Sequence, residues 1–523
     1  MTHQGSELAA VLTSAEPLGP IAHEWINDSF ADELIDDQIV LFRELAKPHM
    51  LFLGRKGAGK SAILGELRRS INKGRGGLPT DQLPPPGSHF VLPVFSWRQF
   101  HQIIKSVHEK HDESEIYADM IPSEHFIELW TETLWDQIIL FFYEYAHHDK
   151  VRAMLEPVVN YVNADAPRTS PPELAAKKLF RDAKESVISF LREWNSTLYF
   201  LFDSMDCYPV RSPIFTRVLT GMFQGLTIVS HETKRIVISF CIPEEIEKFL
   251  AANSANLMKD YASLFRIRWK PIDLIKIVAF RLKASARIHD TNFYTEIEDL
   301  NLNAREDIHK LFSLVLPEKI VNSHGYEEDS LAYVIRHTQL LPRHVLKIFN
   351  AAFSEQLRAT GSFRNMNAAT LRKGVGEAQR TIADEILNPY QRIYPKLIAE
   401  ARKILPDLEP ICDRAALQKV SSRFNRMIED DITVDTIWQT FFDMGVLGRS
   451  LSEDGGSHHG VSANSRYCYG QFHFNADMEF GLATDGEYCF HPVFSRAFGM
   501  TRRSSDTRVV YPANINLDDI YAD

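Results

Sequence analysis

Eight residues near the start of the chain constrain its fold more than any other segment. The run GRKGAGKS occupies residues 54–61, between the apolar run HMLFLG and AILGELRRSI, whose apolar residues have helical spacing. Glycines let the backbone N–H groups of such a loop turn inward, and the start of the helix adds partial positive charge. The pattern therefore predicts a strand, a phosphate-binding loop and a helix, in that order.

The loop fits the G-x-x-x-x-G-K-[ST] pattern of P-loop NTPases at every fixed position. We expect Lys60 to reach the β- and γ-phosphates of a nucleotide and the Ser61 hydroxyl to complete a Mg²⁺ shell. The alternative is a glycine-rich turn that binds nothing, which the flanking strand and helix disfavour. The residues predicted to bind nucleotide are Gly54, Arg55, Lys56, Gly57, Ala58, Gly59, Lys60, Ser61 and Ala62.

A carboxylate for the metal is predicted in LYFLFDSMD, where Asp203 follows five apolar residues. P-loop NTPases need a carboxylate at the end of a neighbouring strand to hold Mg²⁺ through water, and we assign Asp203 to this role. The alternative is a buried strand that ends in a turn-forming aspartate. Asp206 is the candidate for positioning the attacking water, because Ser204 stands where many ring-forming ATPases carry a glutamate.

The remaining patterning predicts an α/β protein with a parallel sheet. The apolar runs HFVLPVFSW, STLYFLFD, RIVISFCI and FRIRW alternate with helical segments, as expected of strands covered on both faces. We expect a P-loop core over residues 1–270, with an insertion at about 98–192 that includes a long helix over 124–146. An almost wholly helical lid should follow over 271–388, with Pro389 as a boundary.

Residues 389–523 are expected to form a winged-helix-like α+β domain. Helices are predicted over 394–405, 414–428 and 435–444, followed by the alternating strands YCYGQFHF and GEYCFHPVF, which we interpret as a two-stranded hairpin. Histidines and cysteines also gather here, but their spacings do not form the close pairs that zinc requires, so packing explains them better. These residues are His458, His459, Cys468, His473, Cys489 and His491.

Charge limits the classes of partner. Lys plus Arg number 58 and Asp plus Glu number 69, a net charge of −11, which excludes a protein that coats nucleic acid by bulk charge. Residues 336–380 nevertheless hold eight basic and two acidic side chains. This segment is either a contact for double-stranded DNA, a solvated helix face, or a docking surface for the chain's own acidic parts. The basic residues are Arg336, Arg343, Lys347, Arg358, Arg364, Arg372, Lys373 and Arg380.

The remaining features indicate a cytoplasmic protein. The five cysteines are scattered without a C-x-x-C, so we expect reduced thiols. The start has no secretory pattern, and the longest apolar runs fall below the roughly 18 residues of a membrane span.

Together these segments resemble the STAND and origin-recognition-type branch of AAA+-like P-loop ATPases, over about residues 34–349. The likeness is carried by GRKGAGKS, LYFLFDSMD, RIVISFCIPEEIEKFL and FRIRWKPIDLIKIVAFRL, and TQLLPRHVLKIF looks like the lid's P-R element. The resemblance implies that Arg343 reaches the γ-phosphate. Leu340 stands where a glycine often precedes the lid proline, and Cys241-Ile242-Pro243 replaces the polar sensor at the end of the fourth strand.

The resemblance implies a nucleotide-driven switch, in which ATP closes the lid on the core and changes the oligomeric state or exposes a partner surface. Bacterial relatives often belong to systems that respond to phage or mobile DNA. The cofactors implied are ATP and Mg²⁺, and ATP is favoured over GTP because no guanine-reading N-K-x-D is found. Arg211 or Arg217 could present an arginine finger to a neighbouring subunit.

Two hypotheses follow. The first is an ATPase switch, with slow or partner-stimulated hydrolysis, that works as a homo-oligomer, with a separate effector protein or with DNA. The second is a DNA-binding regulator or initiator-like protein in which ATP binding, and not hydrolysis, controls DNA contact. Phosphoryl transfer to a small acceptor is a third possibility, for which the sequence contains no visible acceptor pocket.

Overall fold

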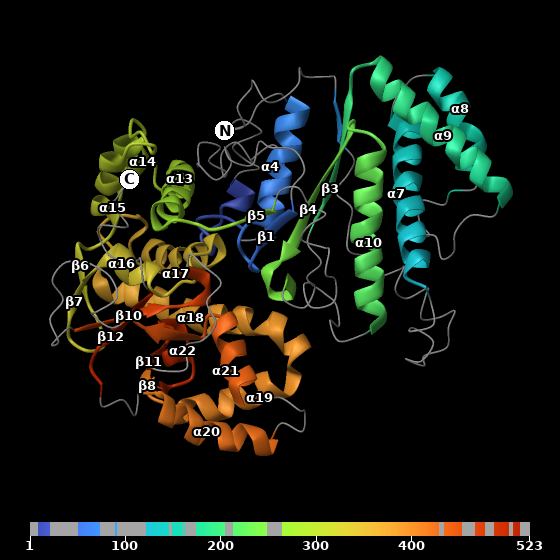
Figure 1. Ribbon diagram of the computed structural model, residues 1–523. Helices are drawn as coiled ribbons and strands as arrows, with labels where there is room; N and C mark the ends of the chain where they lie inside the picture. The colour runs from blue at the N-terminus through green and yellow to red at the C-terminus, as the bar shows by residue number, and fades with distance from the viewer. Residues whose placement is uncertain are drawn as a thin grey trace. The chain divides into compact units, whose positions relative to one another are not determined.

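The computed structural model describes most of the chain (Figure 1). The described residues are 9–20, 51–73, 89–91, 122–145, 149–160, 162, 174–203, 213–247, 264–427, 434–451, 466–475, 486–500 and 506–512. They divide into two compact units. The sheet unit comprises Val40–Arg55 and Lys60–Ile267, and the C-terminal unit comprises Met1–Ile39, Lys56–Gly59 and Arg268–Asp523.

The sheet unit is built on five parallel strands in the order β2-β3-β4-β1-β5. Phe240 of β4 lies opposite Leu51 of β1 on one side and Phe202 of β3 on the other. This arrangement confirms the predicted α/β class with a parallel sheet. The strands are β1 (Leu51–Gly54), β2 (His89–Val91), β3 (Thr197–Phe202), β4 (Ile236–Pro243) and β5 (Leu264–Arg266).

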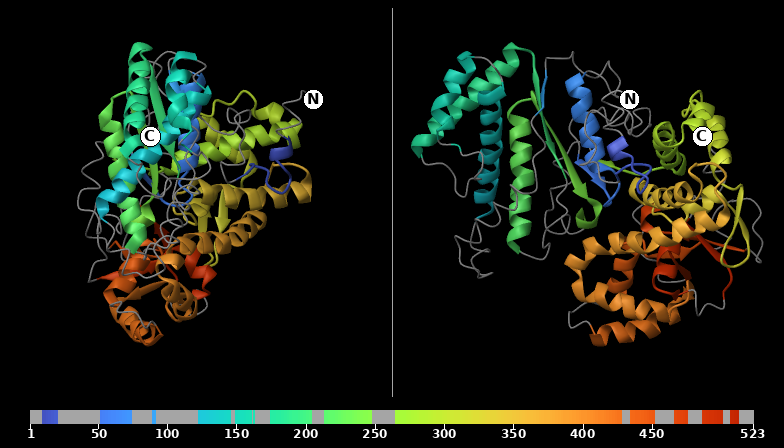
Figure 2. Two further views of the ribbon diagram at one scale, coloured as in Figure 1. Left: turned by 90° about the vertical axis from the view of Figure 1, so that its right-hand side faces the viewer. Right: turned by 180° about the vertical axis from the view of Figure 1, so that it is seen from behind.

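Helices cover both faces of this sheet, as a buried parallel sheet requires (Figures 1 and 2). On one face Ile71 of α4 (Lys60–Lys73) packs against Tyr199 and Val237. The other face carries α7 (Ser123–Tyr145) and α10 (Pro213–Glu232), and Phe142 of α7 contacts Phe90 of β2 edge to face. The long helix predicted over 124–146 is therefore α7, and it belongs to the core of the sheet unit.

The insertion adds α8 (Asp149–Val159) and α9 (Leu174–Glu193) beside α7. Phe190 of α9 also contacts Phe90 of β2. Close approach of α7 and α10 depends on glycine, since a Cβ at Gly221 would lie 2.5 Å from Cβ of Phe126. The described part of the segment between the second and third strands thus covers the sheet and completes its apolar core.

The first part of the C-terminal unit is almost wholly helical, as predicted. Pro389, expected to mark a boundary, lies inside α18, which continues to Ile393. The elements are α13 (Pro271–His289), α14 (Thr291–Ile297), α15 (Arg305–Val315), β6 (Lys319–Val321), β7 (Glu327–Asp329), α16 (Ser330–Ile335), α17 (Pro342–Thr360) and α18 (Ala368–Ile393).

Residues 9–20 pack on these helices through buried polar side chains. Arg281 of α13 donates from Nη1 to the carbonyl oxygens of Leu18 and Pro20, at 3.1 and 2.9 Å. Asn350 of α17 accepts from Leu18 N at 2.7 Å. Burial lowers the pKa of Arg281 to about 10. Because these bonds satisfy backbone groups that would otherwise be buried without partners, the N-terminal residues are an integral part of this unit.

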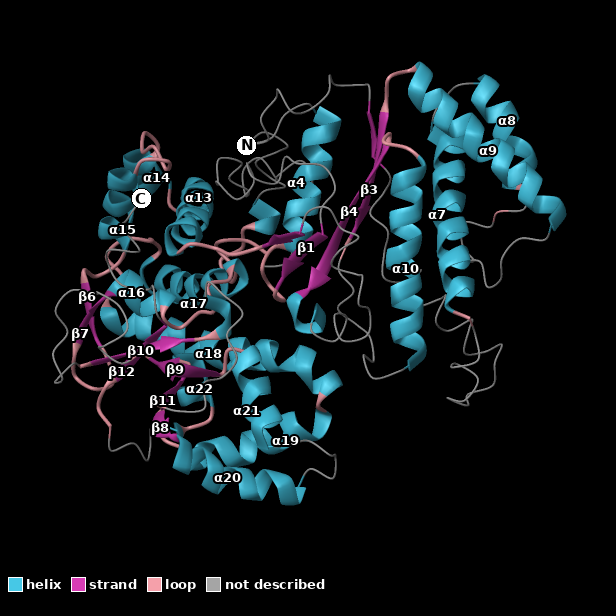
Figure 3. Ribbon diagram, viewed as in Figure 1, coloured by secondary structure: helices cyan, strands magenta, loops and turns pink. Residues whose placement is uncertain are grey.

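The end of the chain forms a second five-stranded sheet, in the order β12-β10-β9-β11-β8 (Figure 3). The predicted hairpin is wrong: β10 and β11 do not pair as neighbours, because β9 lies between them and is antiparallel to both. The four residues of β9 are too few to show alternation in the sequence. The elements are α19 (Pro395–Ile404), β8 (Ile411–Asp413), α20 (Arg414–Met427), α21 (Val434–Asp443), β9 (Leu447–Ser450), β10 (Tyr467–Gln471), β11 (Glu487–Phe490), α22 (Pro492–Ala497) and β12 (Val509–Pro512).

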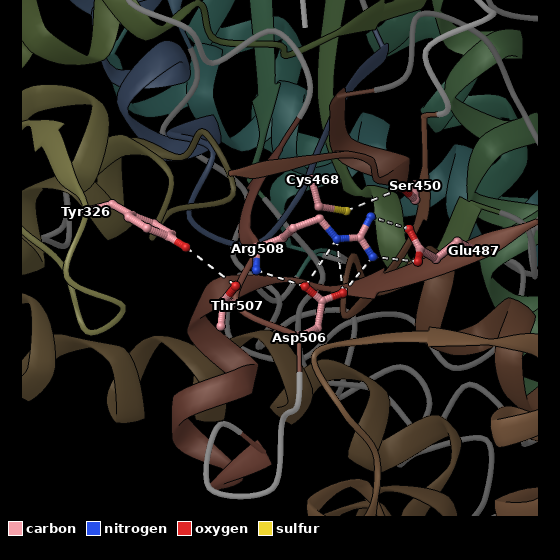
Figure 4. A network of polar contacts seen from close by, with 7 residues as sticks. All are labelled: Tyr326, Ser450, Cys468, Glu487, Asp506, Thr507 and Arg508. Atoms are coloured by element: carbon pink, nitrogen blue, oxygen red, sulfur yellow. Dashed lines mark hydrogen bonds and ion pairs between the residues drawn. The ribbon is translucent and has the colours of Figure 1, made fainter. Parts of the chain in front are cut away.

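Ion pairs join the strands of this second sheet (Figure 4). Arg508 contacts Glu487 at the start of β11 and Asp506 on its own segment, both at 2.6 Å. Tyr326 donates to Thr507 at 3.5 Å. These contacts raise the pKa of the Arg508 guanidinium and lower that of the Asp506 carboxyl.

The cysteines in the described part of this region are buried. Cys412, Cys468 and Cys489 are buried free thiols, and burial raises the pKa of Cys412 to about 12. Within the described residues, no group of three or more His, Cys, Asp or Glu side chains could hold a metal ion. His458 and His459 lie outside the described residues. None of the described helices is long and apolar enough to cross a membrane.

Candidate nucleotide-binding site

The predicted phosphate-binding loop lies between β1 and α4. The strand ends at Gly54 and the helix begins at Lys60. Gly57 and Gly59 have φ angles of 92° and 88°, a region that residues with a Cβ rarely adopt. Gly54 remains part of the strand, so its role is not a left-handed turn. The sequence pattern thus produces a loop whose two bends are at Gly57 and Gly59.

Lys60 is buried and directed into this loop. Its Nζ donates to the carbonyl oxygens of Gly54 and Arg55, at 3.0 and 3.3 Å. The Lys60 carbonyl accepts a weak hydrogen bond from the Cys241 thiol at the end of β4, at 3.9 Å. An ammonium has three donors, so these bonds hold the positive charge inside the curve of the loop, where a phosphate would meet it. Ser61 and Ala62 follow in the first turn of α4 and are partly buried.

The position of Asp203 corrects one detail of the sequence interpretation. Asp203 directly follows β3 and is partly buried, but β3 is not the neighbour of β1, because β4 lies between them. The carboxyl ends of parallel strands lie along one edge of a sheet. Asp203 and the loop after Gly54 therefore lie at the same edge, with Cys241, Ile242 and Pro243 between them.

Two side chains of the C-terminal unit contact the tip of the loop, residues 56–59. Trp269 donates from its indole nitrogen to the carbonyl of Ala58 at 2.9 Å. Arg343, the second residue of α17, covers Gly57: a Cβ there would lie 3.1 Å from Cβ and 3.2 Å from Cδ of Arg343. Among the described residues the Arg343 guanidinium has no hydrogen-bond or ion-pair partner, so its donors are available to an anion.

Trp269 is a site residue that sequence reasoning did not assign. It lies in the passage FRIRWKPIDL, and no spacing rule connects it with Ala58, more than two hundred residues earlier. Two candidates, Asp206 and Arg211, lie outside the described residues, as does Ser204. Arg217 lies in α10 and is partly buried.

The basic segment 336–380 is largely neutralised by carboxylates of its own unit. Arg364 and Lys347 form ion pairs with Glu296 and Glu385, and Glu355 contacts both Arg358 and Lys373, at 2.9 and 2.7 Å. Arg336 is buried against Glu328, and Arg372 donates to the Val321 carbonyl. Five of the eight basic residues thus have a carboxylate partner among the described residues.

Comparison with known proteins shows a weak structural likeness. No protein-family model and no curated protein matches the chain. Among solved structures, the ORC2 protein of Aeropyrum pernix, solved as ADPNP–ADP complexes, is similar at 13% sequence identity. The match covers 79% of this chain and 84% of that chain, with a TM-score of 0.37. A likeness of this size assigns no function.

Proposed function

We propose that the chain binds Mg-ATP at residues 54–62 and acts as an ATP-dependent molecular switch with slow or partner-stimulated hydrolysis. The observation that carries the proposal is the loop between β1 and α4. Its bends require glycine at 57 and 59, and Lys60 is buried inside it. Inward-facing N–H groups, a helix start and an ammonium together form a site for the phosphates of a nucleotide. The guanidinium of Arg343, which has no partner among the residues that the structure describes, adds a further donor set at the loop tip.

Each residue has a proposed role. Lys60 binds the β- and γ-phosphates, Ser61 and Asp203 hold Mg²⁺, the latter through water, and Asp206 positions the attacking water. Arg343 contacts the γ-phosphate. Bound Mg²⁺ would neutralise charge on the phosphate oxygens. The protein supplies the rest by holding these donors at fixed positions before the nucleotide arrives.

Calorimetric titration of the purified chain with Mg-ATP tests the proposal. Wild type should bind, Lys60→Ala should not, and Lys373→Ala, which removes a lysine paired on the surface with Glu355, should bind as wild type does. In a phosphate-release assay Asp206→Ala should retain ATP binding and lose turnover. Absence of ATP binding by the wild-type chain, or equal binding by Lys60→Ala, would refute the proposed function.

We further propose that residues 395–490 form a winged-helix-like domain. In support, the elements follow the order α19, β8, α20, α21, β9 and later β11, and the strands β8, β11 and β9 are adjacent and antiparallel. In a helix-turn-helix the second helix reads the major groove. Here that helix is α21, whose sequence VDTIWQTFFD holds two aspartates and no basic residue. Its charge favours a protein partner, either a second copy or an effector, over duplex DNA.

A DNA-binding regulator is the second candidate, and one observation favours it. The preceding helix α20 has four basic and no acidic residues, in RAALQKVSSRFNRM. Phosphate release measured with and without duplex DNA, over a salt series, separates the two functions. DNA-stimulated release that fades with salt and is lost in Lys419→Glu would establish the DNA-coupled form. Release indifferent to DNA supports the protein-directed switch. A role in phage or mobile-DNA responses is supported by the sequence resemblance alone.

A further inference from the structure

A short connector, residues 336–341, joins α16 to α17 and ends directly before Pro342 and Arg343. Since Arg343 is the second residue of α17, the path of the connector decides where the guanidinium points. Besides local hydrogen bonds to α16 and α17, the connector contacts groups from the second sheet and the segments beside it.

Leu340 in this connector has a φ of 52°. The left-handed region costs an L-residue roughly 1–2 kcal/mol, and a bulky residue there is an outlier. The other described non-glycine residues with positive φ are Asn195 and Asn365, a residue type that tolerates the conformation. Leucine at this position therefore needs tertiary contacts to hold it in place.

The side chain of Leu340 supplies one such contact, because it packs against the apolar core of the second sheet. That core consists of Ile411, Cys468, Phe472, Phe474, Cys489 and Val510. Full burial of a leucine side chain contributes about 1.5–3 kcal/mol. Leu340 is partly buried, so its packing contributes a share of this energy against the backbone cost. A glycine would adopt the same φ without strain and would have no side chain to insert.

Hydrogen bonds hold Thr338 and Gln339 in the middle of the connector. His491 accepts at Nδ1 from Val493 N, so Nε2 carries the proton and donates to the carbonyl of Thr338 at 2.9 Å. Gln339 Nε2 donates to the carbonyls of Met444 and Gly445, each at 3.0 Å. Every one of these partners belongs to the segments around β9 and α22.

At its start the connector is held by a buried ion pair. Arg336 Nε donates to Glu328 at 2.7 Å, and Glu328 also accepts from the hydroxyl of Tyr511 in β12. Both charged side chains are almost fully buried, with exposed fractions of 8% and 0%. The connector is thus attached to the second sheet at its beginning, middle and end.

We infer that the second sheet positions Arg343 through this connector, with Leu340, Gln339 and His491 as positioning residues for contact with the terminal phosphate of ATP. The inference rests on the proposed function. A partner that shifts the second sheet would change the chain's preference for ATP over ADP. By thermodynamic linkage, exchange of ATP for ADP would change the affinity of the second sheet for that partner.

The test compares dissociation constants of the full chain for Mg-ATP and Mg-ADP, and uses their ratio as the readout. Arg343→Ala should reduce the preference for ATP. Leu340→Gly keeps the backbone conformation and removes the anchor, so it should reduce the preference by roughly fivefold or more. In the Arg343→Ala background, Leu340→Gly should have no further effect. The inference would be overturned if Leu340→Gly left the ratio unchanged. It would also be overturned if Leu340→Gly reduced the preference for ATP as much in the Arg343→Ala background as in wild type.

A matched control is Asn365→Gly, which relieves a φ of 50° elsewhere in the same unit and should leave the ratio unchanged. If Leu340→Gly does not fold, Leu340→Asn and Gln339→Ala address the same contacts and should shift the ratio in the same direction. If these variants bind ATP in a Lys60-dependent way and their ratio of dissociation constants for Mg-ATP and Mg-ADP equals that of wild type, the inference is refuted and the proposed function is not. A wild-type chain that binds no ATP refutes both the inference and the proposed function.

Discussion

The indole nitrogen of Trp269 donates a hydrogen bond to the carbonyl oxygen of Ala58 at 2.9 Å, and the ring of Trp269 covers Gly59. The bond joins the tip of the phosphate-binding loop to the residue two positions before α13. Trp269 is almost fully buried. The bond satisfies the carbonyl of Ala58 and links the loop tip to the segment before α13.

Trp269→Phe should therefore weaken Mg-ATP binding. The ring remains but the donor is lost, and a single hydrogen bond contributes about 0.5–1.5 kcal/mol, or roughly a two- to tenfold increase in dissociation constant. Calorimetric titration measures the change. The control is Trp194→Phe, at an exposed position of the sheet unit, which should bind ATP as wild type does. Equal affinity for wild type and Trp269→Phe would exclude a role for the indole donor.

Gly57→Ala should abolish or strongly weaken nucleotide binding. The new methyl group would meet Arg343 at 3.1 Å, at a φ of 92°. Gly361→Ala is the matched control, because Gly361 also has a positive φ, of 72°, and nothing lies within 4 Å of its Cβ position. Both variants should lose about 1–2 kcal/mol of stability through backbone strain. Only Gly57→Ala should lose ATP affinity. A similar loss of affinity in both variants would show that backbone strain alone causes it.

Glu328→Gln should destabilise the C-terminal unit strongly. The substitution leaves the buried Arg336 without its charge partner, which typically costs about 3–5 kcal/mol. Urea unfolding followed by tryptophan fluorescence measures the change in the free energy of unfolding. Glu355→Gln removes a carboxylate from surface pairs with Arg358 and Lys373 and should shift the midpoint far less. Similar midpoint shifts in the two variants would contradict the importance of burial.

Stability of the C-terminal unit should fall as the pH is lowered below about 6.5, the ordinary pKa of histidine. Burial, reinforced by Arg336, His491 and Arg496, holds the pKa of His337 well below that range, while its Nδ1 donates to the Tyr333 carbonyl. The unfolded chain therefore binds a proton that the folded chain does not. One such proton makes the free energy of unfolding change by about 1.4 kcal/mol per pH unit.

The pH prediction is tested by urea unfolding between pH 5 and 8. His337→Asn keeps a side-chain donor and cannot be protonated, so its unfolding free energy should depend on pH by about one proton less than wild type. Identical slopes for wild type and His337→Asn would show that His337 does not resist protonation in the folded state.

The sequence by itself determined the elements whose cause is local. The GRKGAGKS loop, its strand and its helix follow from glycine conformation and apolar spacing, and the long helix α7 and the helical run after Pro271 follow from periodicity. The parallel α/β class follows from continuous apolar strands separated by helices. These features depend on residues within a few positions of each other, so they can be predicted without the fold.

Only the tertiary structure decided which segments meet. The insertion of β4 between β1 and β3, and of β9 between β10 and β11, depends on pairings between distant strands that no local pattern specifies. The charges at 336–380 could be counted from the sequence. The ion pairs that some of them form with Glu296, Glu328 and Glu385 could not be predicted from it. Leu340 could be recognised as an unusual residue before a proline. Its left-handed backbone is supported by packing of its side chain against the core of the second sheet, and that core is assembled from residues 411–510.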